Sequence, residues 1–184
     1  GCSGLIATPS LTVTVNTLPY AGVKNNQAIC INSTIAYNLN SLLTGEDAGG
    51  SWTYAGAPIT STINPSTYTA NTHQFTYEVL GNAPCANDTT VAELTIHEQP
   101  VISSFSASPI TVPQGQQTTL TINMSAGTPN FTAIIIDNGT YSGPLPIFNP
   151  SMSGTLVVTP ILASTTYSIV SITDANGCTT SSAL

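Results

Sequence analysis

The sequence predicts an all-β protein built from tandem β-sandwich modules in an extended, rod-like array. Apolar residues alternate with polar ones in short runs, as they do in half-buried strands. Turn-forming Gly, Pro and Asn residues separate these runs at the spacing typical of sandwiches. More than a quarter of the residues are Ser or Thr and only 5% are charged, so the residues that build exposed helix faces are scarce.

Each alternating run predicts one half-buried strand. In chain order the runs are 11–15, 75–79, 92–96, 120–124, 156–158 and 167–169. The dipeptides that favour turns are Gly49-Gly50, Asn64-Pro65, Asn138-Gly139, Asn149-Pro150 and Asn176-Gly177. No stretch has a helical period. Residues 36–43 come closest, and we expect at most one helical turn there.

Two weak internal repeats indicate where the modules meet. Residues 11–15 are followed by Leu18-Pro19, and residues 94–97 are followed by Gln99-Pro100. Both patterns indicate a last strand that runs into a proline-marked linker. In addition, Gly1-Cys2-Ser3 is similar to residues 177–179 (Gly-Cys-Thr), which close a hairpin after the run at 167–173.

The repeats predict three parts. Residues 1–17 would be the final strand of a preceding module, residues 18–99 one full β-sandwich, and residues 100–184 a second β-sandwich that lacks its last strand. The chain would then be either a segment of a longer tandem array or a subunit that completes its neighbour. An alternative is that residues 1–17 form the first strand of the module at 18–99.

A foreign strand can add to an exposed sheet edge, and this is a known route to assembly. The candidate strand donor in residues 1–17 is the alternating set Leu11, Val13 and Val15. In this hypothesis the donor strand of one copy completes the open module of the next.

The charge balance excludes several partners. Lys24 is the single Lys or Arg, and the net charge is -7. Nucleic-acid binding and attraction to an anionic membrane both depend on basic side chains, so neither is expected. No apolar run is long enough to insert into a membrane, and the sequence contains no basic and apolar leader pattern. Solubility based on hydroxyl and amide groups favours an extracellular or cell-surface location.

The four cysteines are Cys2, Cys30, Cys85 and Cys178. Cys30 and Cys85 belong to the same predicted module, so we expect a disulfide between them, with buried free thiols as the alternative. Cys178 has no partner in its own module, because Val112-Pro113 occupies the position that corresponds to Ile29-Cys30. Cys2 and Cys178 are therefore expected to be unpaired or to pair between molecules. The spacing does not match a zinc site.

Candidate chemical groups are few. His73 and His97 have no local partner for catalysis or metal binding, and we interpret both as exposed polar residues. Glu46-Asp47, in a Gly-rich loop, could supply carboxylates to calcium, but the EF-hand spacing is missing and a solvated turn is the simpler reading. Asp174 is interpreted as a turn residue. We expect no catalytic residues, no resident metal and no cofactor.

Two further side chains have competing interpretations. Lys24 could form an isopeptide bond, although a solvated lysine is the simpler interpretation. Trp52 could be a stacking platform for carbohydrate. Its position between Cys30 and Cys85 favours a core tryptophan instead.

Several motifs resemble a known group of repeats. In the first module they are Ala28-Ile29-Cys30, residues 43–53 (LTGEDAGGSWT), Phe75-Thr76-Tyr77 and residues 83–88 (APCAND). In the second module they are residues 115–121 (GQQTTLT) and 164–178. Across nearly the whole chain, these resemble the Ig-like or PKD-like repeats of large surface adhesins in Bacteroidota.

This resemblance implies secretion by the type IX system and a role in gliding or attachment. Asp88-Thr89-Thr90 resembles the O-glycosylation motif of that phylum, which would place a glycan on Thr89; a bare hydroxyl at a strand start is the alternative. The second repeat type usually has a cysteine where this chain has Pro113.

The sequence therefore favours a non-enzymatic extracellular structural or adhesive segment of a bacterial surface protein or filament. Its partners would be neighbouring modules, copies of itself or surface glycans. One alternative is a self-assembling filament subunit joined by strand donation. Another is a carbohydrate-binding module of a secreted enzyme, in which saccharide would quench the fluorescence of Trp52.

Overall fold

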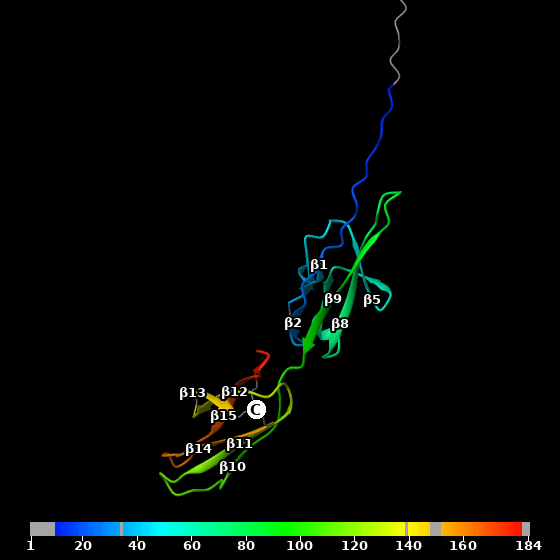
Figure 1. Cartoon of the computed structure of the whole chain (residues 1–184). Coiled ribbons are helices and arrows are strands. Elements are labelled where there is room, and N and C mark those ends of the chain that lie inside the picture. The colour runs from blue at the N-terminus through cyan, green and yellow to red at the C-terminus, as the bar shows by residue number, and fades with distance from the viewer. Residues whose placement is uncertain (1–9, 34, 139, 148–151, 182–184) are drawn as a thin grey trace, which may run out of the picture.

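The computed structural model describes residues 10–33, 35–138, 140–147 and 152–181. Its strands form two groups, β1 to β9 and β10 to β16, which follow one another along the molecule and are joined by residues 98–100 (Figure 1). Among the described residues, every strand ladder lies within one group. The predicted all-β class is confirmed, and no helix in this part of the chain has the length and apolar character needed to cross a bilayer.

Nine strands are described in the first module. They are β1 (Val23–Lys24), β2 (Gln27–Cys30), β3 (Tyr37–Asn38), β4 (Leu43–Thr44), β5 (Ser51–Tyr54), β6 (Ala57–Ile59), β7 (Thr62–Ile63), β8 (Thr72–Val79) and β9 (Asp88–His97). The main sheet has the order β2-β9-β8-β5-β6, with two small ladders, β1-β4 and β3-β7. One 3-10 turn, η1 (Leu39–Leu42), matches the single helical turn expected at 36–43, whereas η2 (Pro65–Thr67) was not expected.

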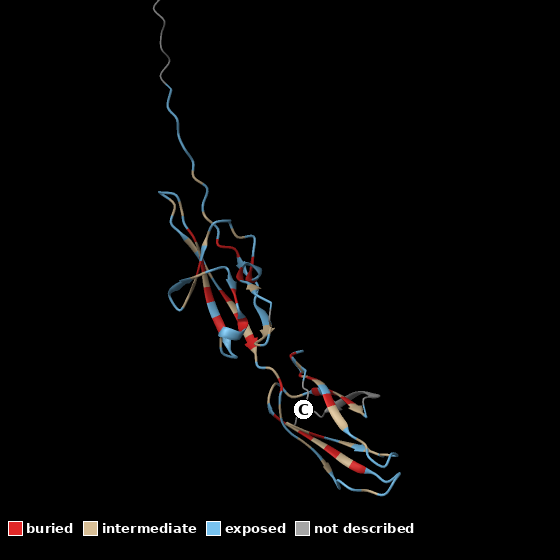
Figure 2. Cartoon of the chain, turned by 180° about the vertical axis from the view of Figure 1, so that it is seen from behind, coloured by how far each residue is buried: buried red, intermediate tan, exposed pale blue. Residues whose placement is uncertain are grey.

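The core of the first module lies on one face of its main sheet (Figure 2). Alternate side chains of β8 and β9 point inward, as the sequence predicts. The buried set on these two strands is His73, Phe75, Tyr77, Val79, Ala92, Leu94 and Ile96. Leu39 and Leu42 of η1 and Trp52 of β5 pack against them.

In the second module the described residues form seven strands. They are β10 (Val101–Ser108), β11 (Thr118–Ala126), β12 (Phe131–Asp137), β13 (Thr140–Ile147), β14 (Ser153–Val158), β15 (Tyr167–Thr173) and β16 (Thr179–Ser181). They form two sheets, β10-β11-β14 and β13-β12-β15-β16. The inner faces of the two sheets enclose a core of Ile122, Met124, Phe131, Ala133, Ile135, Ile169 and Ile172. Two sheets packed face to face through alternating side chains make a β-sandwich.

Residues 10–17 belong to no strand, so they are not the first strand of the module that follows. Leu11, Val13 and Val15 are 89%, 75% and 85% exposed. Figure 1 shows this segment running away from the first module, at the end opposite the second module. The alternation in this run predicts a strand, but in the described structure residues 10–17 pair with no strand.

Candidate functional site

A disulfide between Cys30 and Cys178 links the two modules covalently. The predicted pairing of Cys30 with Cys85 is wrong, and so is the expectation that Cys178 is unpaired or pairs between molecules. β2 pairs in parallel with β9 so that Cys30 lies beside His97, at the far end of β9 from Cys85. From Asp88 to His97 the strand rises about 30 Å, whereas bonded cysteines have Cα atoms within about 7 Å. Cys85 is a free, half-buried thiol.

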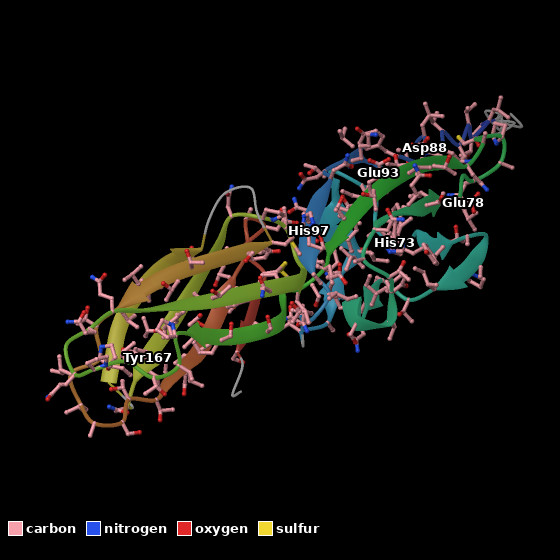
Figure 3. All side chains as sticks on the ribbon, turned by 90° about the horizontal axis from the view of Figure 1, so that it is seen from below. His73, Glu78, Asp88, Glu93, His97 and Tyr167 are labelled. Carbon is pink, nitrogen blue, oxygen red and sulfur yellow. A yellow bond between two sulfur atoms is a disulfide. The ribbon has the colours of Figure 1, made fainter. Side chains whose placement is uncertain are left out.

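Cys30 is held at the module boundary by the main sheet. The Ile31 amide donates a hydrogen bond of 2.9 Å to the carbonyl of His97, and the Ser33 amide closes a turn onto the carbonyl of Cys30 at 3.1 Å. Cys30 therefore sits where β2 and β9 both end, next to the linker at 98–100. Figure 3 shows His97 beside this junction.

Cys178 is fixed by the turn between β15 and β16, which is organised around the buried carboxylate of Asp174. Oδ1 of Asp174 accepts hydrogen bonds from the amides of Asn176 at 3.0 Å and Cys178 at 2.9 Å. Oδ2 accepts from the amide of Thr128 at 3.0 Å. Hydrogen bonds to a charged acceptor are stronger than neutral ones. The interpretation of Asp174 as a turn residue is confirmed, and its carboxylate also positions the bridging cysteine.

A hydrogen bond next to the disulfide also crosses the boundary. The side-chain amide of Asn32 donates to the carbonyl of Thr179 at 2.9 Å. Asn32 follows Cys30 by two residues, and Thr179 follows Cys178 by one. The disulfide and this hydrogen bond therefore join the same two turns. Sequence reasoning missed this pair, because Asn32 carried no signal beyond its nearness to Cys30.

The linker also packs tightly against the second module. Pro100 is fully buried. Gly127 has φ +97° and approaches it so closely that a Cβ on Gly127 would lie 2.8 Å from Cα of Pro100 and 2.9 Å from the ring of Phe131. A side chain cannot fit there, so glycine permits the close approach of the linker to the sandwich.

The free cysteine of the described residues, Cys85, lies away from this junction. Cys85 is in the loop between β8 and β9, and its Sγ is 4.0 Å from the carbonyl oxygen of Asn16. The side-chain amide of Asn16 donates a hydrogen bond of 2.8 Å to the carbonyl of Ala83, so the segment around Asn16 contacts this loop. Cys2 lies outside the described residues.

Thr89 lies in β9 opposite Glu78, and its side chain is exposed. The carboxylate of Asp88 accepts a hydrogen bond from the Ala21 amide at 2.7 Å. Asp88 therefore holds the segment before β1 against β9. The exposed Thr89 hydroxyl is accessible to modification.

Trp52 is 3% exposed and packs against Tyr77 with ring centroids 5.0 Å apart. Its indole N–H donates to Oδ1 of Asn40 at 2.8 Å. The interpretation as a core tryptophan is confirmed, and a buried ring with a satisfied N–H offers no stacking face to a sugar.

His73 is 8% exposed, so its interpretation as an exposed residue is wrong. Its ring nitrogens lie 2.8 Å from the Tyr54 hydroxyl and 2.9 Å from the carbonyl oxygen of Thr69. The rings of Tyr54 and Tyr68 pack against that of His73, and Phe75 packs against both tyrosines, so the four rings form an aromatic cluster. Burial, with Tyr54 second, raises the pKa of Tyr68 above its ordinary value of 10.0. The cluster is packing with satisfied hydrogen bonds, and β8 places His73 in it by alternation.

In the Gly-rich loop that contains Glu46 and Asp47, Asp47 forms hydrogen bonds within the first module. One carboxylate oxygen of Asp47 accepts from the Tyr20 amide at 2.9 Å, and the Asp47 amide donates to the carbonyl of Tyr20 at 2.8 Å. The described residues hold no group of three or more His, Cys, Asp or Glu arranged for a metal ion. Lys24 is exposed on β1, as a solvated lysine would be.

No protein-family model and no curated protein matches the sequence. Solved structures do match the fold. One is the N-terminal eight Ig domains of Down Syndrome Cell Adhesion Molecule, isoform 1.30.30, with a TM-score of 0.56, 14% identity, and coverage of 92% of this chain and 28% of that chain. Another is an I-band fragment of titin, with a TM-score of 0.50, 14% identity, and coverage of 86% of this chain and 61% of that chain.

The chain therefore spans less than two thirds of either similar structure. At this identity the likeness concerns the fold alone. The fold is that of Ig-like β-sandwiches in tandem, in agreement with the architecture predicted from the alternating runs and turn residues.

Proposed function

We propose that this chain is a non-enzymatic, extracellular structural segment whose two sandwiches form a covalently clamped unit under tension. The observation that carries the proposal is the disulfide between Cys30 and Cys178, supported by the hydrogen bond from Asn32 to Thr179. A disulfide across a module boundary is typical of proteins in oxidising compartments.

The bridge changes how tension passes through the chain. Tension applied between residues 10 and 181 follows the covalent path from residue 10 to Cys30, across the disulfide, and from Cys178 to residue 181. The segment between the cysteines, with a sequence separation of 148, is a closed loop off that path. The cores of both modules lie almost entirely in this loop, so the bridge protects them from unfolding by force.

The composition fits an exposed location. Lys24 is the single Lys or Arg of the chain, so proteases that cleave after basic residues find almost no site. A bacterial surface adhesin or filament of the Bacteroidota type, exported by type IX secretion, is the source that the resemblance of residues 43–53 and 164–178 favours. O-glycosylation at the exposed Thr89 belongs to the same proposal. Binding of surface glycans through Trp52 does not, because the ring is buried.

Single-molecule extension tests the proposal. The chain is held by handles attached at its two ends and stretched with and without reductant. We expect the oxidised chain to lack an extension that appears after reduction. That extension corresponds to a separation of 148 residues, about 500 Å at 3.3–3.6 Å per residue. The Cys85→Ser variant is the matched control and should behave as the parent chain does. Equal extension in both conditions would contradict the proposal.

A further inference from the structure

The turn between β15 and β16 contains an asparagine that is followed by a glycine, Asn176-Gly177. Such a pair can deamidate without an enzyme, because the backbone nitrogen of the second residue can attack the side-chain carbonyl carbon of the first. Glycine permits this attack best, since it has no Cβ to obstruct the approach. Both residues are exposed, so water can reach them. The turn that carries Cys178 therefore contains the atoms needed to change its own backbone covalently.

The reaction consumes one water molecule and releases ammonia, and nothing is oxidised or reduced. The nitrogen of Gly177 forms a bond to Cγ of Asn176, and the bond from Cγ to Nδ2 breaks. The amide nitrogen leaves as ammonia with the proton from Gly177, and a cyclic imide remains. Water then adds to either carbonyl carbon of this ring, the proton returns to the Gly177 nitrogen, and the new acid ionises. One product is aspartate, and the other is isoaspartate, whose backbone runs through the former side chain.

Two hydrogen bonds of the folded turn oppose the closure of this ring. Nδ2 of Asn176 donates to Oγ1 of Thr128 at 2.7 Å, so the side-chain amide is held on the loop between β11 and β12. The amide of Gly177 donates to the carbonyl of Asp174 at 3.0 Å, so the attacking nitrogen retains its proton. Ring closure breaks both bonds. The folded turn therefore suppresses the reaction.

The disulfide holds the turn in this conformation. Cys178 follows Gly177 directly, and its sulfur is bonded to Cys30 of the first module. After reduction, the turn is held by the carboxylate of Asp174 and by its contacts with Thr128. Segments with few contacts open locally more often than the rest of a fold. We therefore expect the opening that permits ring closure to be more frequent in the reduced chain.

We propose that Asn176 is a deamidation site that Thr128 and the disulfide between the modules protect, and that reacts when the junction opens. Aspartate at this position adds a negative charge close to the buried carboxylate of Asp174, and like charges at short range repel each other. Isoaspartate adds a carbon to the backbone, so the amides of residues 176 and 178 lose their common alignment on that carboxylate. Either product makes the opening of the turn permanent. The proposal depends on the observed disulfide but not on whether the modules carry tension.

Peptide mapping over time tests the proposal. The full chain is incubated at neutral pH in three states: oxidised, reduced and kept in reductant, and unfolded in urea. Mass spectrometry of the peptic peptide that contains residue 176 measures the loss of asparagine, and an isoaspartate methyltransferase labels the second product. We expect the reduced chain to react at least about fivefold faster than the oxidised chain, and the unfolded chain to react fastest.

Thr128→Val separates the hydrogen bond from the disulfide. It removes the acceptor of Asn176 from an exposed position, so the fold is retained. In the oxidised chain it should accelerate deamidation about fivefold, the equivalent of one neutral hydrogen bond. Thr155→Val is the matched control, because Thr155 is an exposed threonine of β14, in the other sheet of the sandwich, and its replacement should leave the rate unchanged.

The effect of the product is measured with two further variants. Asn176→Asp imitates one product, and it should lower the urea concentration at the midpoint of unfolding by about 0.5 M relative to Asn176→Ser, which cannot deamidate. Equal rates in the oxidised and the reduced chain, equal rates in Thr128→Val and Thr155→Val, or an oxidised chain that reacts as fast as the unfolded one would each overturn the proposal. None of these results would affect the extension experiment on the disulfide.

Discussion

Cys30 and Cys178 are separated by 148 residues in the sequence, yet their Cα atoms are 5.5 Å apart. Each cysteine lies in a turn that its own module builds: one at the common end of β2 and β9, the other in the loop organised by Asp174. The bond therefore joins two positions that the two folds have already fixed. It gives the two sandwiches a second covalent connection, beside the linker at 98–100.

Removal of the bridge should lower stability strongly. In the chain-entropy model, closure of a loop with a separation of 148 residues is worth about 5 kcal/mol. We expect Cys178→Ser to reduce the free energy of unfolding in urea by roughly that amount, or somewhat less if the unfolded chain is compact. Cys85→Ser, which removes a free thiol, should change it by less than about 1 kcal/mol. Equal effects of the two variants would refute the pairing.

Asp174 should be the most sensitive acid in the second module. Replacement by Ala leaves the amides of Thr128, Asn176 and Cys178 without their acceptor, which should cost about 2–4 kcal/mol. Asp47→Ala removes an exposed carboxylate that accepts from one amide, and it should cost below about 1 kcal/mol. Urea denaturation of both variants gives the comparison. A milder effect at Asp174 than at Asp47 would show that the turn does not depend on its carboxylate.

Gly127 should not tolerate a side chain. Gly127→Ala combines a left-handed backbone with a collision against Pro100 and Phe131, and we expect a loss of about 2–4 kcal/mol. Gly115→Ala is the control, because Gly115 has φ +78° but no atom within 4 Å of the added Cβ. Its loss should be about 1 kcal/mol, from the backbone alone. Thermal unfolding of the two variants measures the difference, which would vanish if the linker did not pack against the sandwich.

Trp52 is the single tryptophan, so its fluorescence reports one site. Because the ring is buried, we expect blue-shifted emission that neither acrylamide nor soluble saccharides quench in the folded chain. Quenching should appear only after unfolding in urea. Quenching of the folded chain by a saccharide would restore the hypothesis of a carbohydrate-binding module.

The fold class was predictable because, along a half-buried strand, apolar residues stand at the buried positions and polar residues at the exposed ones. The runs at 75–79 and 92–96 predicted the inward faces of β8 and β9, and the run at 120–124 predicted that of β11. The prediction that Trp52 lies in the core is right, although the disulfide expected beside it does not form. The prediction of an exposed His73 is wrong because a polar side chain gives no sign that its position on β8 faces inward.

The disulfide was not predictable from the same information. The pairing of Cys30 with Cys85 assumed that cysteines in one module meet. The parallel register of β2 with β9, which carries Cys30 to the far end of the module, leaves no trace in a single sequence. The run at 11–15 shows a second limit: alternation predicts that a strand can form, but in the described structure this run pairs with no strand.

The most direct test of this account is the identity of the cysteine that is bonded to Cys30. Peptide mapping by mass spectrometry without reduction, after digestion with pepsin because Lys24 is the single tryptic site, identifies the linked peptides. We predict a peptide pair that contains Cys30 and Cys178, and an unlinked peptide that contains Cys85. A pair that contains Cys30 and Cys85, or a Cys30 peptide with a free thiol in protein from an oxidising source, would contradict the clamp between the two modules.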